Sequence, residues 1–575
     1  MTKKNKNPSK SGSYFNYRGI DLFIPLIFIL AMINPIRAVL SQYYLLSYQD
    51  DIMWVYWVSE NIGHPLSLLT HGPGSGYRVT VNLLFSLGYL LWGANASGFY
   101  LLNGLLFAGS MAFLYLLTKS LADRLSALIA VLLYLFLDSS FILVWKFNFL
   151  TFTSELFFIT SSLYFLIQYF KYGVQKNLYF GIILSIFAFF SKEPSIVIIP
   201  TVNLIYLYHN WNVSPLSNKT KKLLILINII PLFALALVML NVQNAFAPSN
   251  SGSLLELIKE RLLFYIPQEL SWQISNLYLI ILSCLGPFYF YAFNREEYYG
   301  KPTDLIKKIF FIVAFVILFF LFQIIDINSM SSVIIFLLLL LFAFIMGNMN
   351  HRVGIAWFIM ALVPLLATSL KVQPTYLAEP NLGFVIFIGV SVASYIKYIL
   401  SSISSDKHRS SRRDKNKYGP FLTKIILLII VFTLVVQVLA VPSRLSNTTS
   451  YQNTVSDRQT SFKESIDYIV NEVPDGATLY YIPDEKRKAI GGGQINALNL
   501  YQLLSLEGRS DLNIESLDIY DPNSESPDNE RFVVLPSSLD IYILQTQYPD
   551  LLEVIKNSET KIITNGDATA AIVKL

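Results

Sequence analysis

Cysteine is almost absent from this sequence, with Cys284 the only one among 575 residues. An intrachain disulfide is therefore excluded, and no cysteine cluster exists that could bind a metal ion. Charged residues are also scarce: they make up 14% of the chain, against about 25% in an average soluble domain. The sequence contains no GxGxxG or P-loop signature and no internal repeat. Nothing in it predicts a nucleic-acid partner.

Apolar residues dominate instead, because 54% of the chain is hydrophobic and the mean hydropathy is +0.50. Apolar stretches long enough to span a bilayer recur, which predicts a polytopic α-helical membrane protein with about thirteen transmembrane helices. The expected windows are 20–40, 97–118, 123–140, 150–171, 177–191, 194–209, 221–241, 271–293, 306–324, 331–347, 353–370, 382–400 and 421–441.

Lysine and arginine fall in every second connection between these windows, as in KSLADR (119–124) and NKTKK (218–222). By the positive-inside rule, these loops and the N-terminal tail, 1–19, are cytoplasmic. An odd number of helices then places the first loop, 41–96, and the C-terminal region, 442–575, outside. We expect a multi-pass protein of the plasma membrane, whose transmembrane domain occupies residues 20–441.

Residues 442–575 carry 11 Lys and Arg against 20 Asp and Glu, whereas the preceding residues carry 32 against 18. Short runs typical of helices and strands alternate here, which predicts a small extracytoplasmic α/β domain. The expected strands are 478–482, 532–535, 561–564 and 570–574, and the expected helices are 460–472, 494–505 and 549–556.

The first outer loop, 41–96, is long and partly apolar, which is typical of short helices that lie in the membrane interface. The segment 251–266 also predicts an interfacial amphipathic helix. Its apolar positions are Leu254, Leu255, Ile258 and Leu262, and its charged positions are Glu256, Lys259 and Glu260.

Ionisable residues gather at the predicted outer ends of the helices. Such groups are costly near hydrocarbon unless they are paired or solvated, so they are candidates for function. Each alone could be an ordinary interface charge, but their collection on one side favours a site. They are Arg78, Lys146, Lys192 and Lys371, with Asp50, Asp51, Glu155, Glu193 and Glu379.

Two stretches, DDIMWVYWVSENI (50–62) and GYRVTVNLL (76–84), resemble the N-terminal signature of GT-C glycosyltransferases. The similarity is to the protein O-mannosyltransferase and tetratricopeptide-linked mannosyltransferase branches, which show an acidic pair, a YRPL stretch, a GxN turn and an Asn in the second helix. The matching positions are Asp50–Asp51, Tyr77–Arg78, Gly93–Asn95 and Asn103.

Weaker matches follow in family order: Glu155, the segment SKEPSIVIIP (191–200) and the segment TYLAEPNLGFVIFIGV (375–390). The sequence also departs from the family. Val79 replaces the Pro of YRPL, Phe107 replaces a His, and the Arg of the late motif is missing near Gln373 and Thr375. The resemblance therefore transfers neither the sugar nor the lipid.

The resemblance implies the GT-C fold and transfer of a sugar, with inversion, from a polyprenyl-phosphate donor to a glycan, lipid or protein acceptor outside the cell. Asp50 would be the general base. Asp51 would orient the acceptor or bind a divalent cation such as Mg²⁺ or Mn²⁺, because two adjacent carboxylates repel each other and one needs a basic or metal partner. The sequence fixes no cofactor.

A departing phosphate needs cations, and Arg78, Lys192 and Lys371 suit that role. The expected substrate contacts are Glu155, Glu193, Tyr77 and Tyr376.

Simpler interpretations stand beside these roles. Glu193 could only neutralise Lys192, and Glu155 could be a polar contact between helices. We expect Asn103 to bridge helices, and His64 and His71 to be solvated loop residues.

Two other classes of function share this hydropathy. A lipid or solute transporter or flippase should carry an internal repeat and a site near the midplane of the membrane. A non-catalytic GT-C-like protein would keep the helices and the outer domain without the activity. The charges at the outer ends and the long first loop favour the enzyme over the transporter.

Overall fold

The computed structural model describes residues 49–73, 78–135, 137, 150–241, 254–270, 280–286, 313, 317–318, 321, 329–366, 374–408, 463–483, 497–520, 530–535, 538–556, 558–565 and 568–575. The expected windows 20–40 and 421–441 lie outside these residues, and the windows 271–293 and 306–324 lie mostly outside them, so the total of about thirteen helices stays a prediction.

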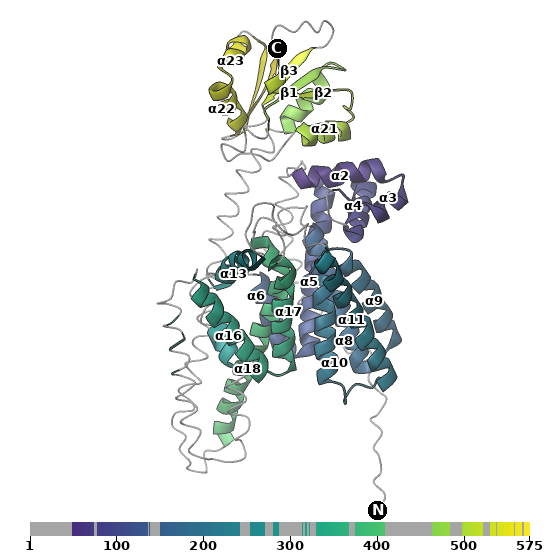
Figure 1. Cartoon of the computed structure of the whole chain (residues 1–575), viewed down its shortest axis with the longest axis vertical. Coiled ribbons are helices and arrows are strands. Elements are labelled where there is room, and N and C mark those ends of the chain that lie inside the picture. Colours follow the sequence, from purple (N-terminus) through teal and green to yellow (C-terminus); the bar gives the residue numbers. More distant parts are fainter. Residues whose placement is uncertain are drawn as a thin grey trace, which may run out of the picture.

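Helices of the transmembrane domain follow the expected windows closely (Figure 1). Four described helices are long and apolar enough to cross a membrane: α5, α8, α17 and the first twenty residues of α18. The protein is therefore a membrane protein. The bundle comprises α5 (Ala96–Leu121), α6 (Arg124–Leu135), α8 (Leu150–Tyr172), α9 (Gln175–Phe189), α10 (Ser195–His209), α11 (Asn218–Asn241), α13 (Leu254–Leu270), α16 (Met330–Met346), α17 (Met349–Leu366), η2 (Pro374–Leu377) and α18 (Ala378–His408).

Glycines allow α18 to pack closely against two neighbouring helices. A Cβ atom on Gly383 would lie 2.6 Å from the carbonyl oxygen of Gly354 in α17. A Cβ atom on Gly389 would lie 2.8 Å from the carbonyl oxygen of Ser126 in α6. A side chain at either position would force the helices apart, so these glycines fix where α18 sits.

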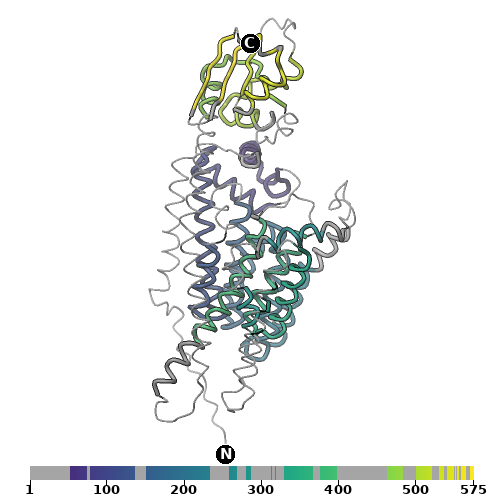
Figure 2. Tube along the Cα trace, turned by 90° about the vertical axis from the view of Figure 1, so that its left-hand side faces the viewer, coloured from purple at the N-terminus to yellow at the C-terminus, as the bar shows by residue number. Residues whose placement is uncertain are grey.

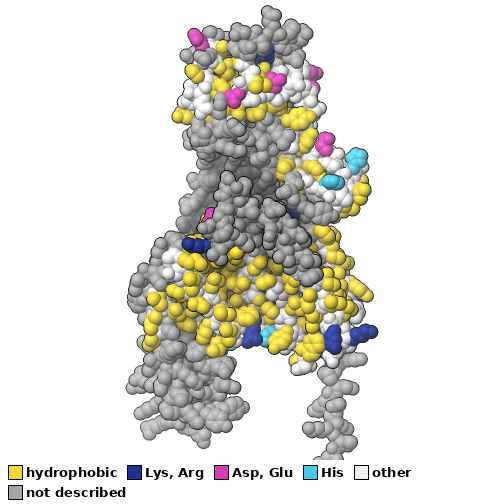
Figure 3. Space-filling view, viewed as in Figure 1, with side chains coloured by type: hydrophobic (Ala, Val, Ile, Leu, Met, Phe, Trp, Pro, Cys, Tyr) yellow, Lys and Arg dark blue, Asp and Glu magenta, His cyan; other side chains and the backbone are white. Residues whose placement is uncertain are grey.

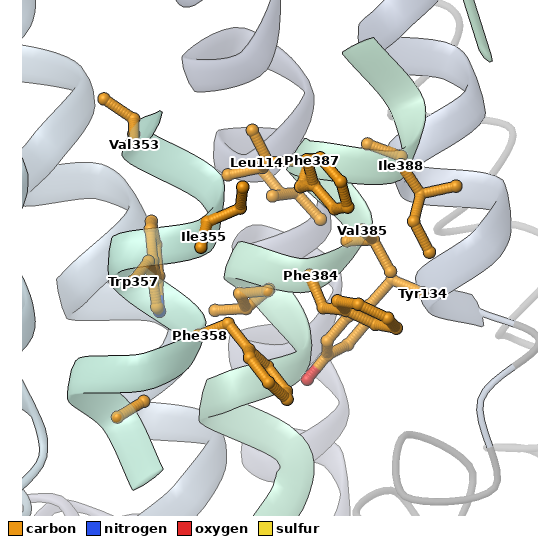
Figure 4. Packing of buried hydrophobic residues seen from close by; sticks show 14 of the residues in the cluster. Leu114, Tyr134, Val353, Ile355, Trp357, Phe358, Phe384, Val385, Phe387 and Ile388 are labelled. Carbon is orange, nitrogen blue, oxygen red and sulfur yellow. The ribbon is translucent and has the colours of Figure 1, made fainter. Parts of the chain in front are cut away.

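Large side chains fill the core around this crossing, including Phe358, Phe384 and Tyr134 (Figure 4). Two large side chains of this core, Tyr134 and Trp357, also form hydrogen bonds with the start of α18. The hydroxyl of Tyr134 donates to the Ala378 carbonyl at 3.0 Å, and Nε1 of Trp357 donates to the Glu379 carbonyl at 3.0 Å. The first turn of α18 is therefore placed by hydrogen bonds as well as by packing.

The first outer loop contains short helices, as expected. Trp54 stacks on Phe85, with ring centroids 5.1 Å apart, and the amide of Asn82 donates to the Leu68 carbonyl at 2.8 Å. These contacts join the helices into one unit, which lies between the bundle and the C-terminal region (Figures 1 and 2). The helices are α2 (Gln49–Asn61), α3 (Pro65–Thr70) and α4 (Val79–Trp92).

The C-terminal region contains a five-stranded sheet with the order β2-β1-β3-β5-β4. Strand β1 pairs in parallel with β2 and β3, and β5 pairs antiparallel with β3 and β4. Each expected strand has an observed strand within two residues of its ends, α21 and α23 lie within three residues of two expected helices, and residues 463–472 are helical, whereas β2 and α22 were not expected. The elements are β1 (Thr478–Tyr481), α21 (Ala497–Leu506), β2 (Asn513–Ser516), η3 (Leu517–Ile519), β3 (Arg531–Leu535), α22 (Ser538–Gln547), α23 (Pro549–Lys556), β4 (Thr560–Asn565) and β5 (Ala568–Lys574).

This α/β domain packs on α2 through α21. The rings of Tyr56 and Tyr501 meet edge to face, with centroids 6.4 Å apart. Ile52 and Val55 of α2 belong to the same hydrophobic cluster as Leu503 of α21. The helix that begins with the acidic pair therefore shares a core with the outer domain.

The opposite end of the bundle carries basic side chains, several of which lie along its rim in Figure 3. The Lys171 ammonium donates to the Ser120 carbonyl, and Lys397 lies 2.5 Å from a carboxylate oxygen of Asp123. The positive-inside rule associates such an end with the cytoplasm. The orientation of the termini stays a prediction.

Candidate functional site

Two oppositely charged side chains meet inside the bundle at the end that faces the α/β domain. Lys192 lies in the turn between α9 and α10, and Glu379 lies in the first turn of α18. Their Nζ and Oε1 atoms are 2.6 Å apart, and the side chains are only 4% and 0% exposed. Burying both charges costs solvation that a simple structural contact would not need, so the pair is a candidate for function.

The turn that carries Lys192 is held by its own serines. The Ser191 hydroxyl donates to the Phe187 carbonyl at 2.8 Å. The Ser195 hydroxyl lies 2.8 Å from the carbonyl oxygens of both Ala188 and Lys192. These local bonds close the turn tightly enough for Lys192 to point into the bundle.

Glu155, in the second turn of α8, is fully buried beside this pair. Its Oε1 atom accepts a hydrogen bond from the backbone N–H of Ser195 at 2.9 Å, which satisfies a donor at the start of α10. The hydroxyl of the same serine donates to the Lys192 carbonyl, so Glu155 lies at the turn that carries Lys192. The structure thus brings together Glu155 and Lys192, which the sequence proposed for different roles, with Glu379.

Aromatic rings cover the Lys192 ammonium. Its Nζ atom is 3.5 Å from the ring centroid of Phe152 and 5.2 Å from that of Tyr376, and the two rings are 5.6 Å apart. Such rings stabilise a cation through their negative faces without neutralising it. Tyr376 and Phe152 therefore both lie at the cluster, and the role of Tyr376 in binding substrate stays a prediction.

Arg261 of α13 is a buried cation that sequence reasoning missed. Arg261 is only 6% exposed, and its Nε atom has no hydrogen-bond partner. No acid among the described residues forms an ion pair with its guanidinium. Helix α13 packs against η2, the 3-10 helix that carries Tyr376, so Arg261 lies at the same end of the bundle as the cluster. The sequence could have identified Arg261 by its spacing. It follows Ile258 by three residues and therefore lies on the helix face that was expected to be apolar.

Arg78 and Glu193 form a second, more exposed pair at this end, with Nη2 and Oε1 3.6 Å apart. The expectation that Glu193 neutralises its neighbour Lys192 is wrong. Lys192 points inward to Glu379, while the Glu193 side chain, 55% exposed, turns outward to Arg78. Adjacent residues in a tight turn point in different directions, which explains the exchange of partners.

Other candidate residues in the described part of the chain form structural contacts or are exposed to solvent. Asn103 bridges helices as expected, because its Oδ1 atom accepts from the Thr153 hydroxyl at 2.5 Å. His64 and His71 are exposed, and His71 contacts the Thr70 hydroxyl. Among the described residues, no group of three or more His, Cys, Asp or Glu is placed to hold a metal ion.

Several predicted site residues lie outside what the structure describes. The backbones of Asp50 and Asp51 belong to the first turn of α2, but their side chains are not described. Tyr77, Lys146 and Lys371 lie outside the described residues entirely. The general base, the cation at Asp51 and the third phosphate contact therefore stay predictions.

No model of a known protein family matches the sequence, and no curated protein matches it. Among solved structures, the chain is similar to ArnT from Cupriavidus metallidurans in the apo state (12% identity, TM-score 0.42) and bound to undecaprenyl phosphate (11% identity, TM-score 0.45). Both alignments cover 96% of this chain and 97% of that chain. The Archaeoglobus fulgidus oligosaccharyltransferase in the apo form aligns with 88% of this chain and 66% of its own, at 12% identity and TM-score 0.39. Similarities at this level carry no argument about function.

Proposed function

We propose that this protein is a membrane glycosyltransferase of the GT-C type. It moves a sugar from a polyprenyl-phosphate-linked donor to a glycan, lipid or protein acceptor on the extracytoplasmic face of the plasma membrane. The observation that carries the proposal is Arg261, a buried guanidinium at the same end of the bundle as Lys192 and without an acidic partner among the described residues. A buried cation needs an anion, and a lipid phosphate is an anion that reaches this depth from the bilayer.

The two cations suit a phosphate in different ways. Arg261 offers a planar fork that grips two phosphate oxygens, whereas Lys192 acts as a point charge. Both lie in a place that excludes water, where electrostatic stabilisation of a departing phosphate is strongest. Arg78, although paired with Glu193, lies near enough to the outer surface to serve the entering headgroup.

The proposed reaction is a displacement at the anomeric carbon. The acceptor O–H proton passes to Asp50 as the acceptor oxygen bonds to that carbon. The bond from the carbon to the phosphate oxygen breaks, and its electron pair leaves with the phosphate towards Lys192 and Arg261. Attack from the face opposite the phosphate inverts the configuration.

The proposed substrate contacts are Tyr376, Tyr77 and Glu193. Tyr376 lies beside Lys192 and presents a ring and a hydroxyl to a sugar, and Tyr77 and Glu193 would approach from the first loop and the α9–α10 turn. The outer domain rests on α2, whose first turn carries Asp50 and Asp51, so it covers the acceptor side.

A transporter or flippase is the alternative class. Its substrate site should lie near the middle of the membrane. The buried charges here instead lie in the second turn of α8, the α9–α10 turn and the first turn of α18, at one end of the bundle. This position favours an enzyme that works at the membrane surface.

The test is to incubate the purified full-length protein, in lipid nanodiscs, with a panel of polyprenyl-phosphate hexoses and to measure release of polyprenyl phosphate, with and without EDTA. We expect turnover of at least one donor. Asp50→Asn should abolish turnover while leaving donor binding, and Arg261→Gln should weaken donor binding.

Lys259→Met is the matched control, because Lys259 is an exposed cation on the same helix as Arg261. It should change neither binding nor turnover. Absence of turnover with every donor, or turnover that Asp50→Asn leaves intact, would contradict the proposal and favour the transporter or the non-catalytic protein.

A further inference from the structure

The start of helix α4 meets the end of helix α9, and one threonine makes two hydrogen bonds there. Thr80 lies in the first turn of α4 and is only 2% exposed. Its backbone N–H donates to the Phe190 carbonyl at 3.2 Å, and its hydroxyl donates to the Phe187 carbonyl at 2.7 Å. Phe187 belongs to the last turn of α9, and Phe190 is the C-cap residue of that helix.

Both hydrogen bonds satisfy backbone groups that a helix leaves without a partner. The first four N–H groups and the last four carbonyls of an α-helix cannot bond within the helix. The Thr80 N–H belongs to the first set, and the Phe187 and Phe190 carbonyls belong to the second set of α9. The positive end of one helix dipole also meets the negative end of the other, which favours the contact.

Lys192 follows this junction directly in the chain. The Phe187 carbonyl that accepts from Thr80 also accepts from the Ser191 hydroxyl at 2.8 Å. Lys192 is the next residue, and its ammonium reaches the Glu379 carboxylate at 2.6 Å. Thr80 therefore bonds to the same carbonyl as the residue that precedes Lys192.

A third contact lies on the other side of Lys192. Arg78, two residues before Thr80, approaches Glu193 with Nη2 and Oε1 3.6 Å apart. The start of α4 therefore contacts the chain both before and after Lys192. Contacts on both sides of a residue in a turn restrict the direction of its side chain.

Helix α4 also contacts the helix that carries the proposed general base. Phe85, five residues after Thr80, stacks on Trp54 of α2, with ring centroids 5.1 Å apart. Since α2 begins with the acidic pair, α4 links the helix of Asp50 to the turn of Lys192. Such a link matters because a displacement of about 1 Å between reacting groups can cost about a hundredfold in rate.

We propose that Thr80 is a positioning residue, which fixes Lys192 by bonding to the end of α9. The Thr80 hydroxyl is engaged by the Phe187 carbonyl, so Thr80 acts through Lys192 and does not act on the donor itself. The contact of Lys192 with a donor phosphate rests on the proposed function. The effect of Thr80 on the α9–α10 turn does not.

Three variants isolate the Thr80 hydroxyl. Thr80→Val keeps the branched shape and the backbone N–H but removes the hydroxyl, whereas Thr80→Ser keeps the hydroxyl. The matched control is Ser86→Ala, because Ser86 is also buried in α4 and its hydroxyl donates to the Asn82 carbonyl of the same helix.

The first experiment needs no donor and measures hydrogen exchange of the full-length protein in lipid nanodiscs. The amides of residues 190–193 should exchange about fivefold faster in Thr80→Val, as the loss of one net hydrogen bond predicts. Thr80→Ser and Ser86→Ala should keep the wild-type rates in this segment. Unchanged exchange in Thr80→Val would overturn the proposal, whatever the protein's function.

The second experiment measures the affinity for a polyprenyl-phosphoryl hexose. Thr80→Val should bind this donor about fivefold more weakly than the wild type, and Thr80→Ser should restore the affinity. The same change is then made in the double variant Lys192→Met with Glu379→Leu. There it should alter the affinity by less than about twofold, because no ammonium remains to be positioned.

The outcomes separate the two proposals. If Thr80→Val weakens donor binding equally with and without Lys192, Thr80 does not act through the ammonium and the positioning role is refuted. If exchange responds as expected and no donor binds to any variant or to the wild type, the effect of Thr80 on the turn stands and the proposed function fails.

Discussion

Lys192 and Glu379 are 187 residues apart in the chain, and their side chains meet at 2.6 Å in the interior of the bundle. The contact joins the turn between α9 and α10 to the first turn of α18. The backbone carbonyl of Glu379 also accepts a hydrogen bond from Trp357, so both the backbone and the side chain of this residue are held in place. The cluster therefore depends on the tertiary fold and on no local motif.

Removal of Lys192 alone should destabilise the protein more than removal of the whole pair. Lys192→Met leaves the Glu379 carboxylate buried without its cation, which should lower the free energy of unfolding by about 3–5 kcal/mol. The double variant Lys192→Met with Glu379→Leu should recover most of this loss and still fail to turn over donor. Denaturant unfolding in detergent, followed by tryptophan fluorescence, measures the difference, and a double variant as unstable as the single one would contradict the argument.

Arg261 should show the opposite relation between stability and function. A buried guanidinium without an acid partner among the described residues is costly, so Arg261→Met should raise the free energy of unfolding of the empty protein by about 1–4 kcal/mol. The same change should weaken donor binding by at least tenfold. Lys259→Met, at an exposed position of α13, should leave both quantities unchanged. A loss of stability in Arg261→Met would mean that the guanidinium has a structural partner.

The helices could be predicted from the sequence because a bilayer demands long apolar runs, and α5 and α8 begin and end within a few residues of their expected windows. Strand β2 could not be predicted, since NIES is short, polar and half exposed. The site was predicted only in part. Charges at the outer helix ends revealed Glu155 and Lys192, but their partners follow from how α8 and α18 pack.

Gly383 should tolerate no side chain. The Cβ of Gly383→Ala would lie 2.6 Å from backbone atoms of Gly354 and Phe358, so α17 and α18 would have to separate. Overpacking of this kind costs about 1–3 kcal/mol, and it would displace Glu379, one turn earlier. We expect a lower unfolding midpoint together with weaker donor binding. Gly63→Ala is the control, since a Cβ there meets nothing within 4 Å, and equal effects at both sites would refute this account.

Asp511 should make the outer domain more stable at neutral pH than in acid. Hydrogen bonds from Arg509 and from the Gly476 N–H hold the pKa of this carboxyl below its usual value. Because the pKa is lower in the folded state, the ionised carboxyl stabilises that state at pH values above its pKa in the unfolded chain, which is about 4. This stabilisation disappears as the pH falls through the pKa of the folded state. Hydrogen exchange of residues 463–483 should therefore be faster in Asp511→Asn at pH 7 and match the wild type in acid. Asp475→Asn, at a position 97% exposed, should have little effect at either pH.

Tyr501 should control the order of α2 from the outer domain. Its ring packs edge to face on Tyr56, and such a pair contributes about 0.5–1.5 kcal/mol beyond the area it buries. Tyr501→Ala should therefore speed hydrogen exchange of the α2 amides, while exchange in α5 stays unchanged. Because α2 begins with Asp50 and Asp51, turnover should fall with little change in donor affinity.

The control for this contact is Tyr542→Ala, which removes an exposed tyrosine from α22 of the same domain. It should leave the exchange of α2 and the turnover at wild-type values. If Tyr501→Ala instead weakens donor binding and leaves turnover per bound donor intact, the outer domain acts on the phosphate site and the placement of the acidic pair does not depend on this contact.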